Sequence, residues 1–380
     1  MKFPFKITLP KFKITPKSCL GIDIGTSLIK IVGLAKSGNR IKLENYGETS
    51  ALALYEEPFR TFEKNTLYLS NAEVVKAIRA ILEEGKIKTR DVIMSLPDFS
   101  SIFTNFELPP MKKEEIPQAV QYEAPQHIPL PLSEVVIDWQ IINTEASEKK
   151  GAKIKILLVA VPNEAISQYQ EIAKLCGLNL QGFEAEAFSF ARAYMNSLRE
   201  KSQHTIALID IGAQSTSCSI IERGVIQISH SFDIAGNELT ETLAKSLGID
   251  YKEANSLKNK YGLNFLKQAP EGNELPSDEK SPKKVAETIA TIIDSILIGT
   301  SRAFQSFSQL ENKKIQKIIL GGGTASLPGL REYASLYLKT DAEIINPFEN
   351  IFYPPVLEKY LRESGPAYAI AIGAALRVLG

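Results

Sequence analysis

The sequence is poor in the residues that build disulfide frameworks and metal centres. It has three cysteines (Cys19, Cys176 and Cys218) and three histidines among 380 residues. The cysteines lie far apart and form none of the close pairs that bind zinc, so a disulfide scaffold and a Cys–His metal site are excluded. The histidines are isolated as well and indicate no Ser-His-Asp triad. We expect the thiols to be reduced and to fill space in the core.

Net charge and long apolar runs are also missing. Lys and Arg number 44, Asp and Glu number 44, and the formal net charge is zero. Without a basic field, nothing favours nucleic acid as a partner. No apolar run reaches the ~18 residues that a membrane helix needs, and no signal peptide is recognisable. We therefore expect a cytoplasmic globular protein, with core enough for two or three domains.

Residues 1–17 form a segment of unusual charge, with five lysines and no acidic residue. Two interpretations fit this segment. The first is a basic flexible arm, because chain termini are often poorly ordered. The second is a weak attraction to an anionic membrane surface, worth about 1 kcal/mol per lysine. The usual behaviour of termini favours the first.

What the sequence does contain is a duplicated pattern. Residues 20–32 and 207–222 each read as an apolar strand with one Asp, a Gly-containing turn and a second apolar strand. In each half a third strand follows, then an amphipathic helix, then a strand–helix–strand–helix segment. The later strands need crossover helices and should lie parallel to the first strand. We therefore predict an α/β fold of two βββαβαβα halves that share a cleft, and a shared cleft indicates a ligand.

The two halves carry insertions at different points. After residue 97 the first half takes a strand-helix-strand-strand piece, and before residue 312 the second half takes a mostly helical piece. The predicted segments are a basic flexible arm at 1–17, the first half at 18–97 and 163–201, the inserted subdomain at 98–162, the second half at 202–248 and 312–380, and a helical subdomain at 249–311.

The residue types at the two turns suit a phosphate ligand. A glycine turn lets backbone N–H groups approach phosphate oxygens, and the adjoining Thr26, Ser27 and Ser215 add hydroxyl donors. Asp23 and Asp210, each two residues before the glycine, can orient water around Mg²⁺, which keeps much of its hydration shell. The alternative is a pair of ordinary hairpins, each with a capping Asp. One copy alone would not decide between the two, but the matched pair favours a clamp on a triphosphate.

A third signal is a glycine cluster in the second half. The apolar strand at 315–320 ends in Gly321, Gly322 and Gly323, and Thr324 leads toward a helix start. Three glycines remove every Cβ at a place where a flat group would lie against the backbone. The spacing is neither that of a Walker A loop nor that of a dinucleotide Gly-x-Gly-x-x-Gly motif. At this strand end the cluster suits an adenosine.

These patterns resemble the two phosphate motifs and the adenosine motif of the actin-like ATPase superfamily, which includes actin, sugar kinases, heat-shock chaperones and FtsA. Within it the chain most resembles the PilM family of cytoplasmic type IV pilus assembly proteins, over nearly all of 19–380. The segments that carry the resemblance are 23–26, 121–129, 134–138, 157–162, 184–188, 210–214, 236–240 and 321–330. An insertion placed in the first half is the FtsA and PilM arrangement, not that of actin.

The resemblance implies a set of nucleotide contacts. It assigns Mg²⁺, held through water, to Asp23 and Asp210, and the positioning of a water to Glu186 and Gln214. The residues matched to ATP contacts are Gly25, Thr26, Ser27, Lys30, Gly212, Ala213, Gln214, Gly236, Asn237, Asn255, Lys258, Gly321, Gly322, Gly323 and Thr324. Relatives usually carry Glu where this chain has Asn255, which can still accept from one ribose hydroxyl and donate to another. A simple helix-start carboxylate is the alternative interpretation of Glu186.

The resemblance also implies a function. PilM-like proteins bind the cytoplasmic N-terminal peptide of the membrane protein PilN, in a groove between the first half and the inserted subdomain. We expect an ATP-binding scaffold with slow or absent hydrolysis, recruited to the inner face of the cytoplasmic membrane in a type IV pilus or related type II secretion-like complex. Other pilus inner-membrane components and a second copy of the chain would be further partners. One alternative is an FtsA-like cell-division protein on the membrane, and another is a small-molecule kinase, for which the sequence offers no substrate base.

Overall fold

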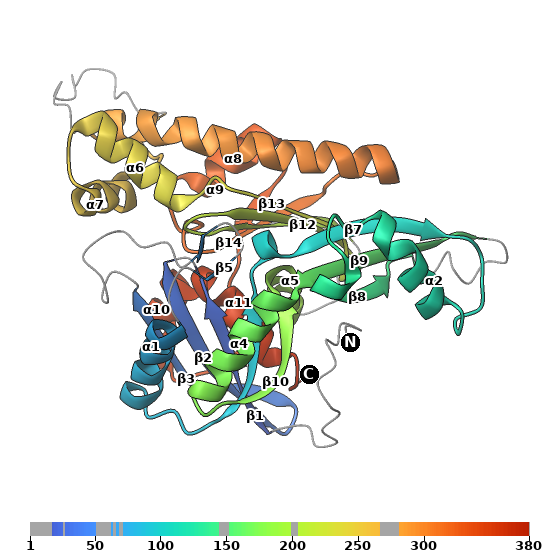
Figure 1. Cartoon of the computed structure of the whole chain (residues 1–380). Coiled ribbons are helices and arrows are strands. Elements are labelled where there is room, and N and C mark those ends of the chain that lie inside the picture. The colour runs from blue at the N-terminus through green and yellow to red at the C-terminus, as the bar shows by residue number, and fades with distance from the viewer. Residues whose placement is uncertain are drawn as a thin grey trace.

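The computed structural model describes residues 17–25, 27–50, 62–63, 66–67, 71–143, 152–198, 204–266 and 281–379. The predicted basic arm, up to residue 16, and the predicted phosphate ligand Thr26 lie outside the described residues. Each half contains a central sheet, and the inserted subdomain projects to one side of the two halves (Figure 1). The long helix α8, Pro282–Glu311, runs along the outer side of the second half (Figure 1).

The first sheet has the strand order β10-β6-β1-β2-β3-β16. Its strands are β1 Ser18–Ile24, β2 Leu28–Ser37, β3 Arg40–Ser50, β6 Asp91–Leu96, β10 Asn179–Ala185 and β16 Ile351–Phe352. β1, β2 and β3 are antiparallel neighbours, whereas β6 and β10 continue the sheet parallel to β1. β1 and β6 are almost continuously apolar and buried, as expected for strands covered on both faces.

The second sheet repeats this arrangement with the order β13-β12-β11-β14-β15. Its strands are β11 Thr205–Ile211, β12 Thr216–Glu222, β13 Val225–Phe232, β14 Lys317–Gly321 and β15 Ala342–Ile344. β11 to β13 are antiparallel, and β14 and β15 extend the sheet parallel to β11. The predicted duplication is confirmed, because both sheets join three antiparallel strands to two parallel ones. The first sheet has β16 as a sixth strand, parallel to β3.

Helices cover the two sheets. They are α1 Asn71–Glu84, α4 Asn163–Leu175, α5 Glu186–Ser197, α6 Gly236–Leu247, α7 Tyr251–Tyr261, α9 Leu330–Leu338, α10 Glu358–Ser364 and α11 Ala369–Leu376, in addition to α8. Short 3₁₀ helices are η2 Asp98–Ser100, η3 Ala124–Gln126, η4 Leu132–Glu134, η5 Pro355–Leu357 and η6 Gly365–Tyr368. α1 buries Val74, Ile78 and Ile81 on one face, which is the predicted amphipathic stripe.

The inserted subdomain is a three-stranded antiparallel sheet with one helix, as the sequence predicts. The strand order is β7-β9-β8, with β7 Ile102–Leu108, β8 Val135–Ile141 and β9 Ile154–Pro162, and the helix is α2 Ile116–Glu123. Ile116 and Val120 of α2 pack with Ile156 and Leu158 of β9 in a separate small core. The remaining described strands are β4 Phe62–Glu63 and β5 Thr66–Leu67, which have two residues each and pair antiparallel.

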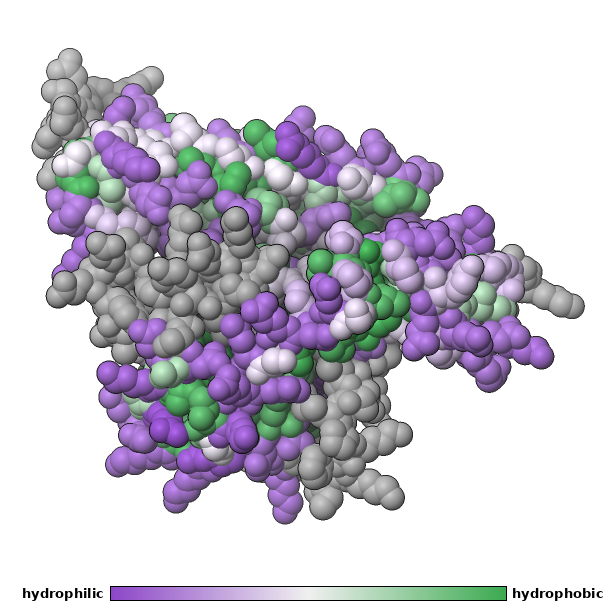
Figure 2. Space-filling model, viewed as in Figure 1, coloured by the Kyte–Doolittle hydropathy of each residue, from purple (hydrophilic) through white to green (hydrophobic). Residues whose placement is uncertain are grey.

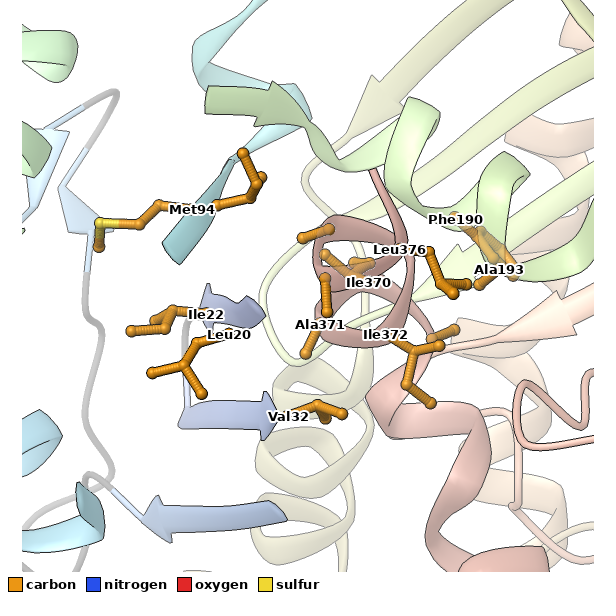
Figure 3. Close-up of a cluster of buried hydrophobic side chains, with 14 of the residues drawn as sticks. Leu20, Ile22, Val32, Met94, Phe190, Ala193, Ile370, Ala371, Ile372 and Leu376 are labelled. Carbon is orange, nitrogen blue, oxygen red and sulfur yellow. The ribbon is translucent and has the colours of Figure 1, made fainter. Parts of the chain in front are cut away.

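Helix α11 packs on the first sheet, although the sequence grouped residues 312–380 with the second half. Figure 3 shows the side chains of α11 between those of β1 and those of α5. A Cβ on Gly21 would lie 1.8 Å from the carbonyl oxygen of Ala371, and a Cβ on Gly373 would lie 1.7 Å from that of Ser189. Glycine therefore lets the backbones of β1, α11 and α5 touch directly, and the C-terminal segment ties the two halves together.

Candidate functional site

The two glycine turns have the same geometry. The N–H of Gly25 donates to the carbonyl of Leu28 at 3.0 Å, and the N–H of Gly212 donates to that of Ser215 at 3.0 Å. A Cβ added at either glycine would lie 3.0 Å from the same carbonyl oxygen, which is tighter than side chains normally allow. The duplication in the sequence is thus also a duplication of backbone shape.

A cleft lies between the two turns, with about 610 Å³ of empty space that is partly open to solvent. It brings together residues of both halves, as predicted. The predicted residues that line it are Asp23, Gly25, Ser27, Lys30, Glu186, Asp210, Gly212, Ala213, Gly322 and Gly323. Sequence reasoning missed Phe99, Ala367 and Ile370, which also line the cleft. The last two lie near the C-terminus, so only the return of that segment to the first half explains their position.

Two aspartates face each other across the cleft floor. Asp23 accepts a hydrogen bond from Ser95 Oγ at 3.1 Å, and its Oδ2 lies 3.7 Å from Lys30 Nζ. Burial raises the pKa of Asp23, although Lys30 and Ser95 oppose the shift. Burial, and then the charge of Asp23, raise the pKa of Asp210 from 3.8 to about 7. The floor therefore carries more negative charge than Lys30 can balance.

Glu186 and Asp98 add two more carboxylates. The N–H of Asp98 donates to Glu186 Oε2 at 3.2 Å, and the N–H of Ala187 donates to Asp98 Oδ1 at 3.1 Å. Burial, and then Asp23, raise the pKa of Glu186 well above its usual range. Burial raises the pKa of Asp98 to about 7, even though the bond from Ala187 opposes the shift. Sequence reasoning missed Asp98; its signal was a position just beyond the buried strand β6, at the sheet edge where ligands bind in α/β folds.

The second turn is held by the start of α6 and by Thr324. The N–H groups of Gly236 and Asn237 donate to the carbonyls of Gly212 and Ala213 at 3.1 and 2.7 Å. The hydroxyl of Thr324 donates to the Gly212 carbonyl at 3.0 Å. These three predicted residues therefore form a layer that supports the turn. The side-chain Oε1 of Gln214, beside it, is buried and has no hydrogen-bond partner among the residues that the structure describes.

Lys258 and Asn255 lie one turn apart on α7. Lys258 Nζ donates to the carbonyl of Gly236 at 3.2 Å and to Thr240 Oγ1 at 2.7 Å. Burial lowers the pKa of Lys258 to about 8. Residues three apart on a helix share a face, so Asn255 lies on the side of α7 that faces α6. Lys258 thus reaches the same end of α6 that supports the second turn.

A second hollow is apolar and lies where the inserted subdomain joins the first half. It has about 340 Å³ of empty space that is partly open to solvent, and it is lined by Leu96, Val136, Asp138, Val159, Val161, Phe183, Glu184, Ala185 and Phe188. We call this hollow the groove. Figure 2 shows hydrophobic residues gathered on the surface near this junction. The buried Glu184 accepts from Ser189 Oγ at 2.9 Å and pairs with Arg192 and Arg377, so its charge is compensated.

Known proteins are similar to nearly the whole length of this chain. A family model described as type IV pilus assembly protein PilM matches residues 21–379. Among solved structures, the chain is similar to the PilM-PilN type IV pilus biogenesis complex, with a TM-score of 0.81 and 23% identity over 97% of this chain and 100% of that one. Within the described part of the chain, no helix combines the length and apolar character needed to cross a membrane.

Other proteins are also similar to this chain. Cell division protein FtsA of Pseudomonas aeruginosa is 23% identical over 369 residues, which cover 90% of this chain and 82% of that protein. FtsA of Staphylococcus epidermidis is 21% identical over 82% of this chain and 71% of its own length. The structure of MreB5 of Spiroplasma citri bound to ADP has a TM-score of 0.54 and 12% identity, over 96% of each chain. The fold is therefore that of the actin-like ATPases.

Proposed function

The chain belongs to the family of type IV pilus assembly proteins PilM, and from this premise we propose that it is a nucleotide-binding scaffold that holds a membrane partner of the pilus machinery. The observation that carries the proposal is the pairing of two sites in one molecule. A polar cleft lies between the duplicated turns, and an apolar groove lies beside it. The first suits a charged nucleotide and the second an extended apolar peptide.

The residues around the cleft suit ATP as the ligand. The turns at Gly25 and Gly212 both line the cleft, and Ser27 brings a hydroxyl that would donate to a phosphate oxygen. Gly323 has open space where its Cβ would be, which leaves room for the adenosine beside the backbone. Asn255 and Lys258 would border the ribose and base from α7. The buried, unpaired Oε1 of Gln214 is a free acceptor in the same region of the described chain.

The carboxylates also suit Mg²⁺ bound mainly through water and phosphate. Among the described residues, no three His, Cys, Asp or Glu side chains are placed to hold a metal directly. Asp23 and Asp210 lie at the cleft floor with raised pKa values, because burial disfavours their charged forms and, at Asp210, the charge of Asp23 adds to the shift. A hydrated divalent cation would favour the charged forms and neutralise phosphate charge. Turnover is expected to be slow or absent, since Glu186 is engaged by the backbone of Asp98.

The apolar groove suits a peptide as its binding partner. Its floor comes from the first half and its wall from β8 and β9 of the inserted subdomain. The solved PilM-PilN complex has the same fold, so the partner proposed for this groove is the cytoplasmic N-terminal segment of a PilN-like membrane protein. Binding such a segment would recruit the chain to the inner face of the cytoplasmic membrane. Other pilus inner-membrane proteins and self-association are further proposed contacts.

Nucleotide binding can be tested by titrating Mg-ATP into the wild type and into Asp23→Ala and Asp210→Ala. We expect each variant to bind at least about tenfold more weakly, because a carboxylate that orients the hydrated cation is lost. Unchanged affinity for Mg-ATP in both folded variants would contradict the proposal that the two turns hold a Mg-nucleotide between them.

Peptide binding can be tested with a fluorescent peptide that copies the cytoplasmic start of the PilN-like protein from the same genome. Val136→Asp places a charge in the groove and should abolish binding, because a buried unpaired carboxylate is costly. The matched control is Val356→Asp, at a valine that is 86% exposed and outside the groove. If the two variants bind equally well, the peptide site lies elsewhere.

An FtsA-like role in cell division is the second candidate, because the FtsA proteins match most of this chain. The discriminating observation is the neighbourhood of the gene. Pilus genes beside it support the first function, and division genes would favour the second.

A further inference from the structure

The segment that precedes β1 carries an alternating sequence pattern that the proposed function does not use. Large apolar residues occupy every second position from Phe3 to Leu9, and proline, lysine and threonine lie between them. Alternate side chains of an extended chain share one face, so this pattern suits a strand with one apolar face. Pro4 and Pro10 disfavour a helix. Segments without a binding surface usually contain few aromatic and β-branched residues, so this composition indicates that the segment has a surface to bind.

The groove is a surface of the matching kind. Its lining is apolar apart from Asp138 and Glu184, and it is partly open to solvent. Arg192 and Arg377 compensate the charge of Glu184, which leaves Asp138 as the other charged group of the lining. Residues 1–16 include four lysines and no acidic residue, so their charge is opposite to that of Asp138. The groove therefore suits the segment in both hydrophobicity and charge.

The segment is attached close enough to reach the groove. Ser18, where β1 begins, lies beside the chain that enters β6, with 3.2 Å between its Oγ and Thr89 Oγ1. Leu96, which lines the groove, is seven residues beyond Thr89, at most about 23 Å away at ~3.3 Å per residue. Residues 10–17 span up to about 27 Å when extended. They cover this distance and leave residues 3–9, the alternating part, at the groove.

We propose that residues 3–9 dock in the groove of their own chain and compete there with the partner's peptide. Tethering gives the segment an effective concentration on the order of 1 mM. A contact with a dissociation constant of about 0.2 mM then fills the groove about five-sixths of the time and weakens peptide binding about sixfold. A weak contact is therefore enough to regulate the groove. The docking depends on the groove alone, whereas the competition rests on the proposed function and extends it.

Docking is tested without any peptide, by disulfide formation in the full chain. The native cysteines are buried, so Phe5→Cys and Val136→Cys together supply one accessible pair, and we expect mild oxidation to join them within one chain. A disulfide needs Cα atoms within about 7 Å, so the bond reports direct contact. The matched control pairs Phe5→Cys with Val356→Cys, at an exposed valine outside the groove, and should react at least about fivefold more slowly. If Val136→Cys does not fold, Asp138→Cys supplies another thiol in the groove.

Competition is tested with the fluorescent PilN-like peptide and the full chain. Ile7→Asp places a charge on the apolar face of the segment, so the segment leaves the groove and peptide binding should tighten at least about threefold. Thr8→Asp is the matched control, because it adds the same charge at the next position, on the opposite face. Its affinity for the peptide should stay within about twofold of the wild-type value.

The proposal is overturned if the Val136→Cys pair forms no disulfide, or forms it no faster than the Val356→Cys pair. Disulfides between chains overturn it as well, because the segment then binds a second copy. Equal peptide affinities of the wild type and Ile7→Asp overturn the competition. Failure of the proposed function differs from all of these: no variant then binds the peptide, while the disulfide still reports where the segment docks.

Discussion

At the scale of single residues, the three consecutive glycines of the second half lie in different surroundings. A Cβ on Gly321 would lie 2.5 Å from the ring of Phe190. Gly322 has a φ of +85°, and its Cβ would lie 2.5 Å from both Asp210 Oδ1 and the carbonyl of Ile211. A Cβ on Gly323 would meet nothing within 4 Å among the described residues. Two of the glycines are therefore explained by packing within the protein, and only the third leaves open space at the cleft.

This difference predicts the effects of two neighbouring substitutions. Gly322→Ala should lower the free energy of unfolding by about 1–3 kcal/mol, since it adds both left-handed backbone strain and a clash with Asp210. Gly323→Ala should change it by less than about 0.5 kcal/mol. Urea unfolding of both variants checks this, and equal stabilities would contradict the placement of the cluster.

The aspartates at the cleft floor predict how stability depends on pH. The pKa of Asp210 is about 7 in the folded protein, against 3.8 for an unperturbed aspartate, so between these values the folded chain holds a proton that the unfolded chain releases. Its contribution to stability is therefore full below about pH 4 and is lost as the pH rises to 7. Asp210→Asn removes this titration and resembles the protonated form.

Without nucleotide and Mg²⁺, Asp210→Asn should be more stable than the wild type at pH 8, by on the order of 4 kcal/mol, because the pKa of Asp210 rises by about three units and one unit corresponds to about 1.4 kcal/mol. The two proteins should be similarly stable near pH 4.5. Thermal unfolding across this range checks the sign. A wild type that is the more stable protein at pH 8 would show that Asp210 is well compensated in the folded state.

At the scale of elements, the contact between β1 and α11 holds the C-terminal segment on the first half. Gly21 lies against the carbonyl of Ala371, and α11 lies against α5 at Gly373. Such backbone contacts cannot widen by a side-chain rotation, so a methyl group must move the whole helix. The helix also carries Ile370, which lines the cleft, so its position matters to the site.

We predict that Gly21→Ala destabilises the protein by about 3 kcal/mol or more and weakens Mg-ATP binding as well. Gly33→Ala, on the neighbouring strand β2, is the control. Its Cβ would meet the side chain of Leu20 at 3.3 Å, which can adjust, so its effect should be much smaller. Chemical unfolding and nucleotide titration of both variants measure this difference, and comparable losses would argue against direct contact of β1 and α11.

At the scale of the whole molecule, the two halves meet around the cleft and are bridged at one side by the inserted subdomain. The bridge includes a 2.6 Å ion pair between Lys155 of β9 and Glu311 of α8. Both side chains are partly exposed, so the pair contributes little to stability, about 1 kcal/mol at most. A contact of this strength can break and re-form as the halves rotate, which suits a hinge around a nucleotide.

Nucleotide should therefore change the distance between the halves. The native cysteines are all buried, so labels can be directed to Leu175→Cys on the first half and Leu336→Cys on the second, both exposed positions. We expect Mg-ATP to narrow the distribution of label distances and to shift its mean. A distribution that is identical with and without bound nucleotide would contradict the hinge.

Much of the architecture follows from local patterns. Apolar runs bounded by glycine turns predict β1, β2, β11 and β12, because strand periodicity and turn chemistry act over a few residues. The repetition of that pattern then predicts two equivalent sheets and the meeting of Asp23 with Asp210. The position of Asp98 could not be derived in this way, since a single Asp after a strand also fits an ordinary turn.

The duplicated α/β halves, the inserted subdomain and the two glycine turns can be read from the amino-acid order alone, because each depends on spacing within one segment. How those segments meet depends on the folded chain. Folding joins Asp98 to Glu186, 88 residues apart, and brings α11 from the second half onto the first sheet. It also forms the apolar groove from strands of two subdomains. Such contacts depend on the complementary shapes of complete sheets and helices, which no local pattern specifies.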